Sequence, residues 1–236
     1  MWMRGLKIKR VSDRDVKSQN DQLVIEKHAK VLCEGVLHEI GCTQGLDKEL
    51  AIGVAMSHHD GHPYWHTVQT DEGWTLTKSD VRTAPLPDVG SVKKPRQPKK
   101  DDEELYVTRQ DIFLLTAYFQ ENALLYKHTG VTHSAAFASR EDLTCFAEDL
   151  YQMPAVYKIL GQAVLEGHVH DIMIVSGRVD LALVSAAVAA GVKILVSRTG
   201  VTDKAFDYAQ QNDLTMVGFA RGMRFNMYTH SERIKI

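Results

Sequence analysis

The stretch DIMIVSGRVDLALVSAAVAAGVKILVSR, residues 171–198, decides the fold class. Its first seven residues form a short apolar run bounded by polar residues, which is typical of a buried strand. Residues 180–191 then have the pattern of a helix, with Asp180 placed as its N-cap and Gly191 as its stop. Residues 192–198 repeat the strand pattern. The stretch therefore predicts a strand–helix–strand unit.

The alternation of strand and helix continues to the C-terminus. Residues 201–213 have the pattern of a second helix, which we expect Thr202 to cap, and residues 214–220 form another apolar run. The segment RFNMYTH, residues 224–230, is a candidate to extend the sheet. Loops this short between strands and helices imply right-handed crossovers. The sequence therefore predicts an α/β fold in which helices cover a largely parallel sheet.

Two further helices are expected upstream, over residues 108–130 and 155–167, and each stops at a glycine. Between them, TGVTHSAAF (129–137) places His133 at the start of a helix of small residues. A helix N-terminus presents unpaired N–H groups. His133 therefore marks an anion or cofactor site in one interpretation, and a capping or packing residue in the other. Residues 105–236 are predicted to form one α/β domain.

The first 80 residues lack the regular alternation of strand and helix and predict a smaller N-terminal α+β domain. Residues 22–33 alternate in the manner of a strand, residues 47–59 indicate a short helix, and a later hairpin is expected to turn at Gly73. Residues 81–104 carry four of the six prolines, then a basic block and an acidic block. We expect this segment to be a linker or mobile loop.

Composition excludes several classes of protein. The formal net charge of −2 at pH 7 favours neither nucleic acid nor a membrane surface as a partner. No apolar stretch approaches the ~20 residues that a membrane span needs. The N-terminus lacks the apolar region of a secretory signal. We therefore expect a cytoplasmic protein.

A histidine-rich segment, MSHHDGHPYWH (56–66), raises the question of a metal site. Imidazoles and a carboxylate at such spacing suit zinc or nickel. However, no second cluster supplies matching ligands, and the glycine and proline indicate a surface loop, so we expect no metal. A zinc deaminase is excluded because Ala135 stands where its His-x-Glu motif needs the glutamate, and the chain has no Cys-x-x-Cys.

The chain has three cysteines, which are too few for a disulfide framework. Cys145 lies among apolar neighbours, and Cys33 alternates with apolar residues in an expected strand, so both are expected to pack in the interior. Cys42, in EIGCTQG, lies between two glycines in an expected loop. It is therefore predicted to be the most accessible thiol.

Charged residues at two places are candidates for a site. Glu148 and Asp149 precede an expected helix, where they are dipole partners and caps in one interpretation and catalytic carboxylates in the other. At the end of the last buried strand, Arg221 and Arg224 flank Gly222. Two guanidinium groups around a flexible glycine suit a phosphate or a carboxylate. The alternative is a turn whose arginines point into water.

Several segments together resemble the formate dehydrogenase accessory proteins, the FdhD family. Residues 194–230 are similar to its C-terminal signature, in which a strand ending in Val-Ser-Arg is followed by a helix and a Gly-Phe-x-Arg strand. TGVTHSAAF and EDLYQMPAVYKILG are similar to its Thr-Gly-Gly-x-His-Ala-Ala and Glu-Asp-Val-Gly-Arg-His-Asn motifs. SGR (176–178) and KELAIG (48–53) also match, so the resemblance covers most of the chain.

The resemblance implies a cytoplasmic sulfur-transfer protein required for active formate dehydrogenase. Members of this family receive sulfur from a cysteine desulfurase and pass it to a molybdenum cofactor with two pterin guanine dinucleotides, which they bind as cargo. The implied fold is a three-layer α/β/α sandwich of the cytidine-deaminase-like type, generally a homodimer. The implied cofactor-binding residues are Phe219, Ala220, Arg221, Gly222, Met223 and Arg224, together with His133.

Two departures from the family pattern bear on activity. The region of the family's Cys-Gly-x-Cys stretch, here residues 78–97, has no cysteine, and Tyr151-Gln152-Met153-Pro154 replaces its Gly-Arg-His-Asn. We expect an accessory protein that delivers sulfur to the cofactor or, as the alternative, a chaperone that binds the cofactor without sulfur transfer. Enzymatic activity stays open. The rival class, an unrelated α/β enzyme for a phosphorylated metabolite, has no matched acid/base pair in the sequence.

Overall fold

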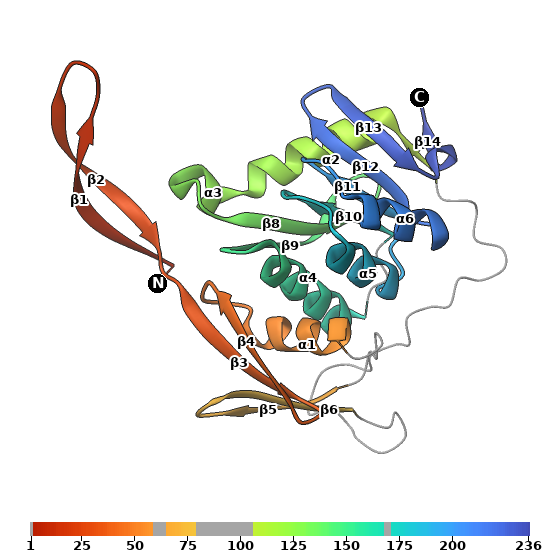
Figure 1. The fold of residues 1–236 in the computed structure, drawn as a ribbon, viewed down its shortest axis with the longest axis horizontal. Coiled ribbons are helices and arrows are strands. Elements are labelled where there is room, and N and C mark those ends of the chain that lie inside the picture. The colour runs from red at the N-terminus through yellow and green to blue at the C-terminus, as the bar shows by residue number, and fades with distance from the viewer. Residues whose placement is uncertain (1, 59–64, 79–105, 168–170) are drawn as a thin grey trace.

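A six-stranded mixed sheet organises the C-terminal part of the chain (Figure 1). The computed structural model describes residues 2–58, 65–78, 106–167 and 171–236. The strands of the large sheet lie in the order β13-β12-β11-β10-β8-β9. Their bounds are β8 His133–Ala138, β9 Leu143–Asp149, β10 Ile172–Val175, β11 Ile194–Ser197, β12 Thr215–Arg221 and β13 Arg224–Thr229.

Three neighbouring strands of this sheet, β10, β11 and β12, are parallel, as the alternation of strand and helix predicts. The other pairings are antiparallel: β8 pairs with β10 and β9, and β13 pairs with β12. The prediction of a largely parallel sheet is therefore wrong for the remaining strands. Short turns join β8 to β9 and β12 to β13. Strands that are joined by such tight turns pair antiparallel, because parallel strands need a longer crossover connection.

Strand β8 contradicts the helix that was expected to begin at His133, because His133 is the first residue of this strand. Successive residues of this strand point to opposite faces of the sheet. Ala135 and Phe137 lie in the core on one face, and Ala136 and Ala138 lie in the core on the other. A strand that is buried on both faces shows no alternation of polar and apolar residues. Its sequence pattern therefore cannot be told from that of a short buried helix.

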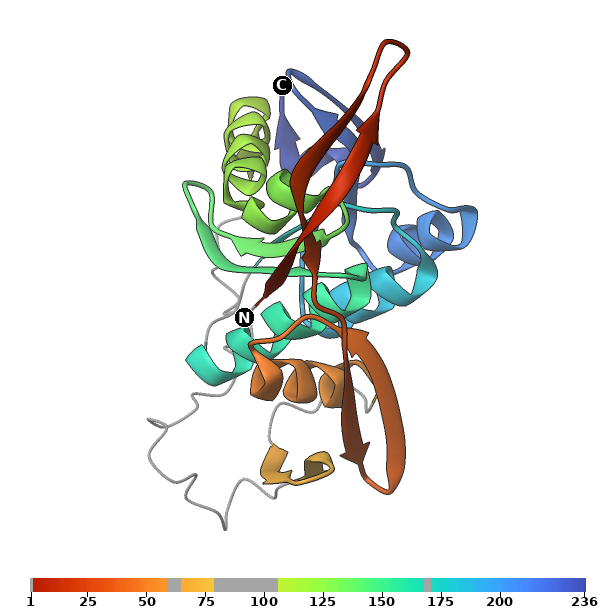
Figure 2. The same cartoon turned by 90° about the vertical axis from the view of Figure 1, so that its left-hand side faces the viewer.

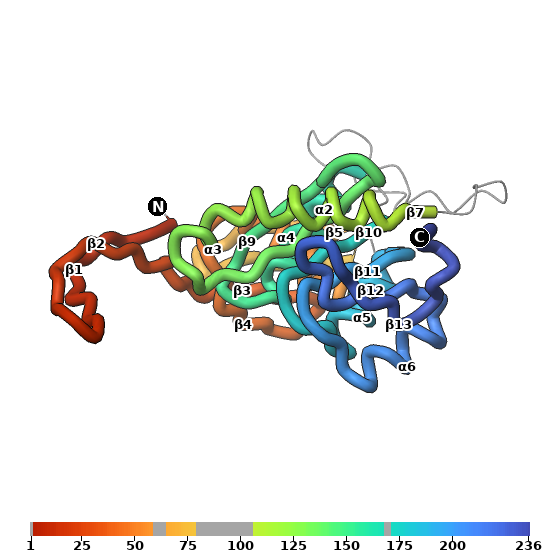
Figure 3. Tube along the Cα trace, turned by 90° about the horizontal axis from the view of Figure 1, so that it is seen from above, coloured from red at the N-terminus to blue at the C-terminus, as the bar shows by residue number. Residues whose placement is uncertain are grey.

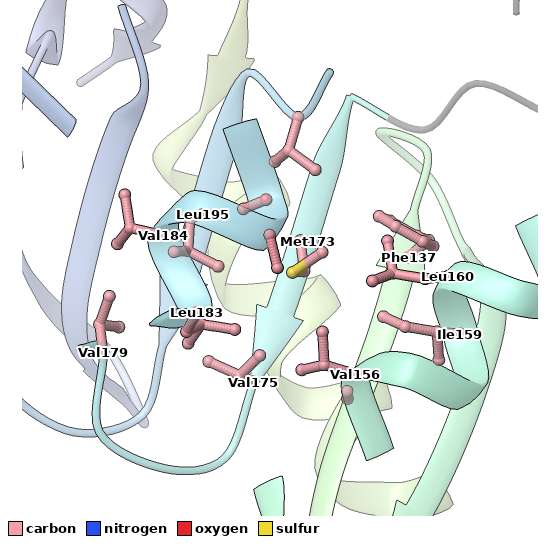
Figure 4. Packing of buried hydrophobic residues seen from close by; sticks show 14 of the residues in the cluster. Phe137, Val156, Ile159, Leu160, Met173, Val175, Val179, Leu183, Val184 and Leu195 are labelled. Atoms are coloured by element: carbon pink, nitrogen blue, oxygen red, sulfur yellow. The ribbon is translucent and has the colours of Figure 1, made fainter. Parts of the chain in front are cut away.

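Helices cover both faces of the large sheet, which gives three layers (Figures 1 and 4). Helix α2 (Arg109–Asn122) packs on one face. Helices α4 (Gln152–Glu166), α5 (Leu181–Ala189) and α6 (Asp203–Gln211) pack on the other. The core between these three helices and the sheet includes Phe137, Val156, Ile159, Leu160, Met173, Val175, Leu183, Val184 and Leu195 (Figure 4). The predicted α/β class is confirmed.

The long amphipathic helix expected upstream of β8 is divided at Ala123 into α2 and α3 (Leu124–Thr129). The carboxylate of Glu148, in β9, accepts hydrogen bonds from the backbone N–H groups of Leu125 (2.7 Å) and Tyr126 (2.9 Å). These N–H groups belong to the first turn of α3, which has no intrahelical acceptors for them. Glu148 is therefore a cap, as one interpretation held, but for a helix that precedes it in the sequence.

The other predicted caps and glycine stops are confirmed, whereas α4 begins at Gln152, before its predicted start at residue 155. Asp180 accepts a hydrogen bond from the Leu183 N–H (3.0 Å), and Thr202 accepts one from the Ala205 N–H (3.3 Å). Gly167 ends α4 in a left-handed conformation. Gly191, which follows α5, is also left-handed, with φ of 79°. Each cap is a local feature, which is why sequence alone located it.

The N-terminal part consists of two β units and one helix. A hairpin of β1 and β2, which the sequence did not predict, projects from the body (Figures 1 and 3). A four-stranded sheet in the order β4-β3-β6-β5 packs against α1. The bounds are β1 Met3–Val11, β2 Val16–Val24, β3 Lys27–Cys33, β4 Val36–Cys42, α1 Asp47–His58, β5 Trp65–Thr70 and β6 Gly73–Lys78.

Helix α1 and the hairpin of β5 and β6 agree with the sequence analysis, and Gly73 follows the turn with φ of 141°. The single strand expected over residues 22–33 is instead the end of β2 followed by β3. The domain boundaries stay a prediction, and the expected linker, residues 81–104, lies outside the described residues.

Short elements complete the fold. Near the C-terminus, a 3-10 helix, η1 (Ser231–Arg233), precedes β14 (Ile234–Lys235). Strand β14 pairs in parallel with β7 (Val107–Thr108), the strand just before α2. Among the described residues, none of the helices has the length and apolar character that crossing a membrane requires.

Helices α1 and α4 touch backbone to backbone through two glycines (Figure 2). A Cβ atom on Gly53 would lie 1.9 Å from the carbonyl oxygen of Tyr157, and one on Gly161 would lie 1.9 Å from the carbonyl oxygen of Glu49. Only a hydrogen atom fits at either position. The two glycines therefore set how closely the N-terminal part packs on the helical layer of the large sheet.

A buried ion pair joins β9, α4 and the residue that follows β4. Lys158 Nζ lies 2.7 Å from Asp149 Oδ2, and the two side chains are 1% and 0% exposed. Asp149 Oδ1 also accepts hydrogen bonds from the N–H groups of Thr43 (2.8 Å) and Leu150 (2.7 Å). Burial raises the pKa of Asp149, while Lys158 and the two backbone donors oppose that rise. Asp149 is buried and bound by Lys158 and two backbone N–H groups, which gives it a structural role, and the catalytic role considered from sequence stays a prediction.

Gly161→Ala should lower the free energy of unfolding by roughly 3 kcal/mol, because the new methyl group forces two helix backbones apart. Gly5→Ala is the matched control, since a Cβ there meets nothing closer than 3.9 Å. Urea unfolding of both variants measures the difference. Equal stability of the two variants would show that α1 and α4 can move apart without loss of packing energy.

Lys158→Met should destabilise the fold by about 3–5 kcal/mol near neutral pH, because it leaves the Asp149 carboxylate buried without a counter-charge. In this variant the folded chain binds the Asp149 proton more tightly than the unfolded chain. Stability should therefore be lost as the pH rises through the raised folded pKa, and should recover towards about pH 5. Urea unfolding across pH measures this, and Lys158→Met combined with Asp149→Leu is the control that should restore stability. A loss that does not change with pH would contradict an ionised Asp149.

Candidate functional site

The carboxyl ends of the parallel strands β10, β11 and β12 lie at one edge of the large sheet, and the antiparallel strand β8 begins at that edge. This edge, here called the carboxyl edge, collects His133 and residues 176–178, 198–200 and 219–224. Ligands of open α/β folds bind at such an edge. The structure thus places His133 and the C-terminal segment, for which the family resemblance implies cofactor binding, at opposite ends of the same edge.

Arg198 and Arg221 form the centre of the carboxyl edge. Arg221 Nε donates a hydrogen bond to the Arg198 carbonyl oxygen at 2.6 Å, which holds the two residues side by side. Burial lowers the pKa of the Arg198 guanidinium, and the charge of Arg221 lowers it further. Arg198 Nε is buried and has no hydrogen-bond partner among the described residues. A buried guanidinium N–H without a partner is a donor prepared for an anion.

Phe219 is held in a strained conformation beside these arginines. Its φ is 53°, a left-handed value that is uncommon for an aromatic residue, and its N–H donates to the Thr199 carbonyl oxygen at 2.9 Å. Its ring lies over Gly200, where a Cβ atom would come within 3.1 Å of Phe219 Cζ. The residue as a whole is nevertheless 43% exposed. The site therefore offers an aromatic face next to guanidinium groups.

The turn between β12 and β13 completes this side of the edge. Gly222 has φ of 57°, and Arg221 and Arg224 are cross-strand partners on either side of the turn. Met223 is 79% exposed at the tip. Ala220 is buried, so its side chain packs in the core instead of facing a ligand. Of the residues implied by the resemblance, Ala220 alone turns its side chain inward.

The buried hydroxyl group of Ser197 joins two loops of the carboxyl edge. Ser197 Oγ donates to the Gly177 carbonyl oxygen at 2.7 Å and accepts from the Thr199 N–H at 3.0 Å. These two bonds tie the loop after β11 to the loop after β10. The arginines of both loops are therefore presented from a rigid frame, which lowers the entropy lost when a ligand binds.

His133 lies at the opposite end of the carboxyl edge, next to Gly177. Its Nδ1 lies 3.1 Å from Ser176 Oγ. Gln152, the first residue of α4, donates from Nε2 to the Arg178 carbonyl oxygen at 2.6 Å. A Cβ atom on Gly177 would lie 2.2 Å from Gln152 Oε1 and 3.0 Å from the imidazole ring. Gly177 therefore lets the strand, the helix and the histidine meet.

The carboxyl edge is strongly cationic. It contains Arg178, Arg198, Arg221 and Arg224, and none of these four takes part in a salt bridge with any residue that the structure describes. Sequence reasoning singled out two of these and missed Arg178 and Arg198. The signal for Arg198 was its place directly after a buried parallel strand, where open sheets bind ligands.

All three thiols are buried. The exposed fractions of Cys33, Cys42 and Cys145 are 0%, 1% and 4%. Burial raises the pKa of Cys33 to about 11 and that of Cys145 to about 12, and it also raises the pKa of Cys42. The prediction that Cys42 is the most accessible thiol is wrong, because Cys145 is slightly more exposed and both are buried. Cys42 is the last residue of β4, and the Asp149–Lys158 pair lies close enough to influence its pKa.

The expected absence of a metal stays a prediction. Part of the histidine-rich segment, residues 59–64, lies outside the described residues. Of its remaining histidines, His58 has Nε2 at 3.3 Å from the Tyr157 hydroxyl. In the described part of the chain, one other group brings three ligand atoms within 4.8 Å of one another: Asp213, His230 and Glu232. That group lies near the C-terminus, and Arg233 already binds Asp213.

Comparisons with known proteins agree with this architecture. A solved structure of a candidate formate dehydrogenase accessory protein from Desulfotalea psychrophila superposes with a TM-score of 0.81, covering 99% of this chain and 100% of that one at 16% identity. The two chains therefore share a fold.

Curated relatives share sequence over the C-terminal part. The sulfur carrier protein FdhD of Methanothermobacter thermautotrophicus is 37% identical over 135 residues, which are 56% of this chain and 54% of the relative. The protein of the same name from Sulfurisphaera tokodaii is 38% identical over 132 residues, 54% of this chain and 52% of the relative. The chain thus spans about half the length of the curated relatives that it matches. The family model for FdhD/NarQ matches residues 74–235, which is more than half of the chain. The chain belongs to the FdhD/NarQ family.

Proposed function

We propose that this chain is an accessory protein for formate dehydrogenase that binds a molybdenum cofactor carrying guanine dinucleotides. One observation carries the proposal: the buried, unpartnered Nε of Arg198 beside Arg221, at the carboxyl edge of the sheet. The names of the relatives, sulfur carrier proteins and a candidate formate dehydrogenase accessory protein, support the same role. The cofactor is cargo, held until it is delivered to the dehydrogenase.

The residues of the carboxyl edge fit such a cargo. Its phosphate groups need several N–H donors, and guanidinium groups bind phosphate oxygens in pairs with matched geometry. Arg178, Arg198, Arg221 and Arg224 supply these donors. The exposed face of Phe219 is suited to stacking on a flat purine or pterin ring. The edge combines both kinds of contact that a dinucleotide-bearing ligand requires.

The accessibility of the thiols bears on whether the chain is a sulfur carrier or a cofactor-binding chaperone. A sulfur carrier holds sulfur as a persulfide on a cysteine, and the reacting species is an accessible thiolate. The chain has three cysteines, and all of them are buried with a raised pKa. The observations therefore favour a chaperone that binds the cofactor without carrying sulfur on its own cysteines. Sulfur delivery, favoured by the names of the relatives, is the second candidate.

Several partners belong to this proposal and rest on the resemblance. They are formate dehydrogenase as the recipient, a cysteine desulfurase as sulfur donor in the second candidate, and another copy of the chain in a homodimer. The cytoplasmic location belongs with them. The proposal includes neither nucleic acid nor a membrane as a partner, because the formal net charge of −2 favours neither.

We expect guanosine diphosphate to bind the purified chain, with an affinity that falls as salt is added, because salt screens arginine–phosphate attraction. Arg221→Ala should weaken binding by about tenfold or more, the loss of one charge-assisted hydrogen bond. Titration calorimetry at two ionic strengths measures both effects.

Arg140→Ala is the control for this experiment. Arg140 is exposed in the turn between β8 and β9, at the opposite edge of the sheet, so its loss should leave the affinity unchanged. The melting temperature of both variants should stay near that of the parent chain. Equal affinity of the Arg221→Ala and Arg140→Ala variants would place the nucleotide site elsewhere.

We further expect no persulfide when the chain is incubated with a cysteine desulfurase and labelled cysteine, since no thiol of the chain is accessible. Intact mass measurement should show no added sulfur atom on the folded protein. Unfolding in urea before thiol alkylation provides the positive control and should reveal all three cysteines. A stable persulfide on Cys42 that is lost in Cys42→Ser would instead establish the sulfur-carrier form.

A further inference from the structure

Ser176 joins the loop after β10 to strand β8 through its side-chain hydroxyl. Its backbone N–H donates to the Ser134 carbonyl oxygen at 3.0 Å, and its Oγ accepts from the Ser134 N–H at 2.9 Å. These two bonds fix the position of the hydroxyl oxygen. The same oxygen lies 3.1 Å from His133 Nδ1.

The hydroxyl proton of Ser176 has one acceptor among the described residues, which is His133 Nδ1. Since Oγ already accepts from Ser134, the economical arrangement is that the hydroxyl donates to Nδ1. A neutral imidazole carries one proton, so an Nδ1 that accepts leaves the proton on Nε2. His133 Nε2 has no hydrogen-bond partner among the described residues and is not one of their fully buried unpartnered atoms, so this nitrogen keeps some exposure to solvent.

We propose that Ser176 is a positioning residue that holds His133 in the Nε2–H tautomer, so that the neutral imidazole donates a hydrogen bond to the anionic ligand of the carboxyl edge. This inference rests on the proposed function and adds a specific role for one residue pair. Ser176 does not touch the ligand itself. It acts by fixing which nitrogen of His133 faces the ligand.

The electrostatic surroundings agree with a neutral imidazole. Burial lowers the pKa of His133, and the guanidinium of Arg178 lowers it further. Asp149, its cross-strand partner on β9, directs its carboxylate oxygens to Lys158, Thr43 and Leu150. Gln152, from α4, is uncharged. Among the residues that the structure describes, the charged group that influences the ring, Arg178, therefore disfavours the imidazolium form.

A neutral donor has a distinct function in a site that already holds four arginines. A further full charge would be repelled by Arg178 and its neighbours before a ligand arrives. A neutral N–H donor is not repelled by the arginines. It can still orient the ligand, because a hydrogen bond requires a defined angle and distance. His133 would thereby fix the orientation of a ligand that the arginines attract.

Two substitutions separate the nitrogen atoms of His133. The side-chain amide N–H of glutamine can occupy the place of Nε2–H, whereas the shorter asparagine places its amide near Nδ1. With guanosine diphosphate as the probe, His133→Gln should bind within about threefold of the parent chain, and His133→Asn should bind about tenfold more weakly. Equal losses in the two variants, or a greater loss in His133→Gln, would overturn the proposal.

The tautomer itself can be observed by two-bond ¹H–¹⁵N correlation spectra of the histidine rings. The His133 signals, assigned by their absence in His133→Gln, should show an unprotonated Nδ1 and a protonated Nε2 near neutral pH. Ser176→Thr keeps a hydroxyl and should keep this pattern, whereas Ser176→Ala removes the partner of Nδ1 and should add a detectable fraction of the tautomer protonated at Nδ1. A protonated Nδ1 in the parent chain would refute the assignment.

The failure of this inference can be told from a failure of the proposed function. If Arg221→Ala does not weaken binding of guanosine diphosphate, the proposed function fails. If Arg221→Ala weakens it while His133→Gln and His133→Asn behave alike, the proposed function stands and the role of Ser176 and His133 is wrong. The spectra decide the tautomer independently of any binding measurement.

Discussion

The buried pair of Lys158 and Asp149 is the constraint on which the rest of the structure depends. Two charges that are at most 1% exposed are stable only as partners, because an uncompensated charge in the interior is strongly destabilising. Asp149 ends β9 and Lys158 lies in the second turn of α4, so their contact sets where that helix begins. The start of α4 in turn carries Gln152 to the loop after β10. The Thr43 N–H, bound to the same carboxylate, attaches the N-terminal part at this point. The Gly53 and Gly161 contact then fixes the distance between the two helices.

This rigid frame allows an energetically unfavourable surface to exist at the carboxyl edge. Four arginines gather there without carboxylate partners among the described residues, and Phe219 adopts a left-handed backbone conformation. Such features are stable only where the surrounding structure over-determines them, and they concentrate at functional sites. The hydroxyl of Ser197 and the amide of Gln152 link the loops that carry the arginines. Binding an anion would relieve the repulsion between Arg198 and Arg221, which is the physical basis for expecting affinity at this edge.

The same structure separates the two candidate functions, cofactor binding and sulfur transfer. Binding depends on the carboxyl edge, whereas sulfur transfer depends on a thiolate. Burial raises the pKa of every thiol in this chain, and Cys42 lies near the Asp149–Lys158 pair in the structural centre of the fold. A conformational change that exposed Cys42 would also disturb that pair. The proposed ligand would therefore be held by cations and hydrogen bonds, while the three buried cysteines contribute to packing.

The sequence by itself determined the features that depend on neighbouring residues. Asp180 and Thr202 begin helices and Gly167 ends one because caps are satisfied within a few residues, and the strand–helix alternation over 171–220 follows from local periodicity. The arginines of the last turn were visible for the same reason. Only the tertiary structure decided that His133 starts a strand, that Cys42 is buried and that Arg198 Nε lies beside Arg221 without a hydrogen-bond partner among the described residues. Each of these depends on contacts between residues distant in sequence, and burial on both faces of β8 removes the alternation that would have identified it as a strand.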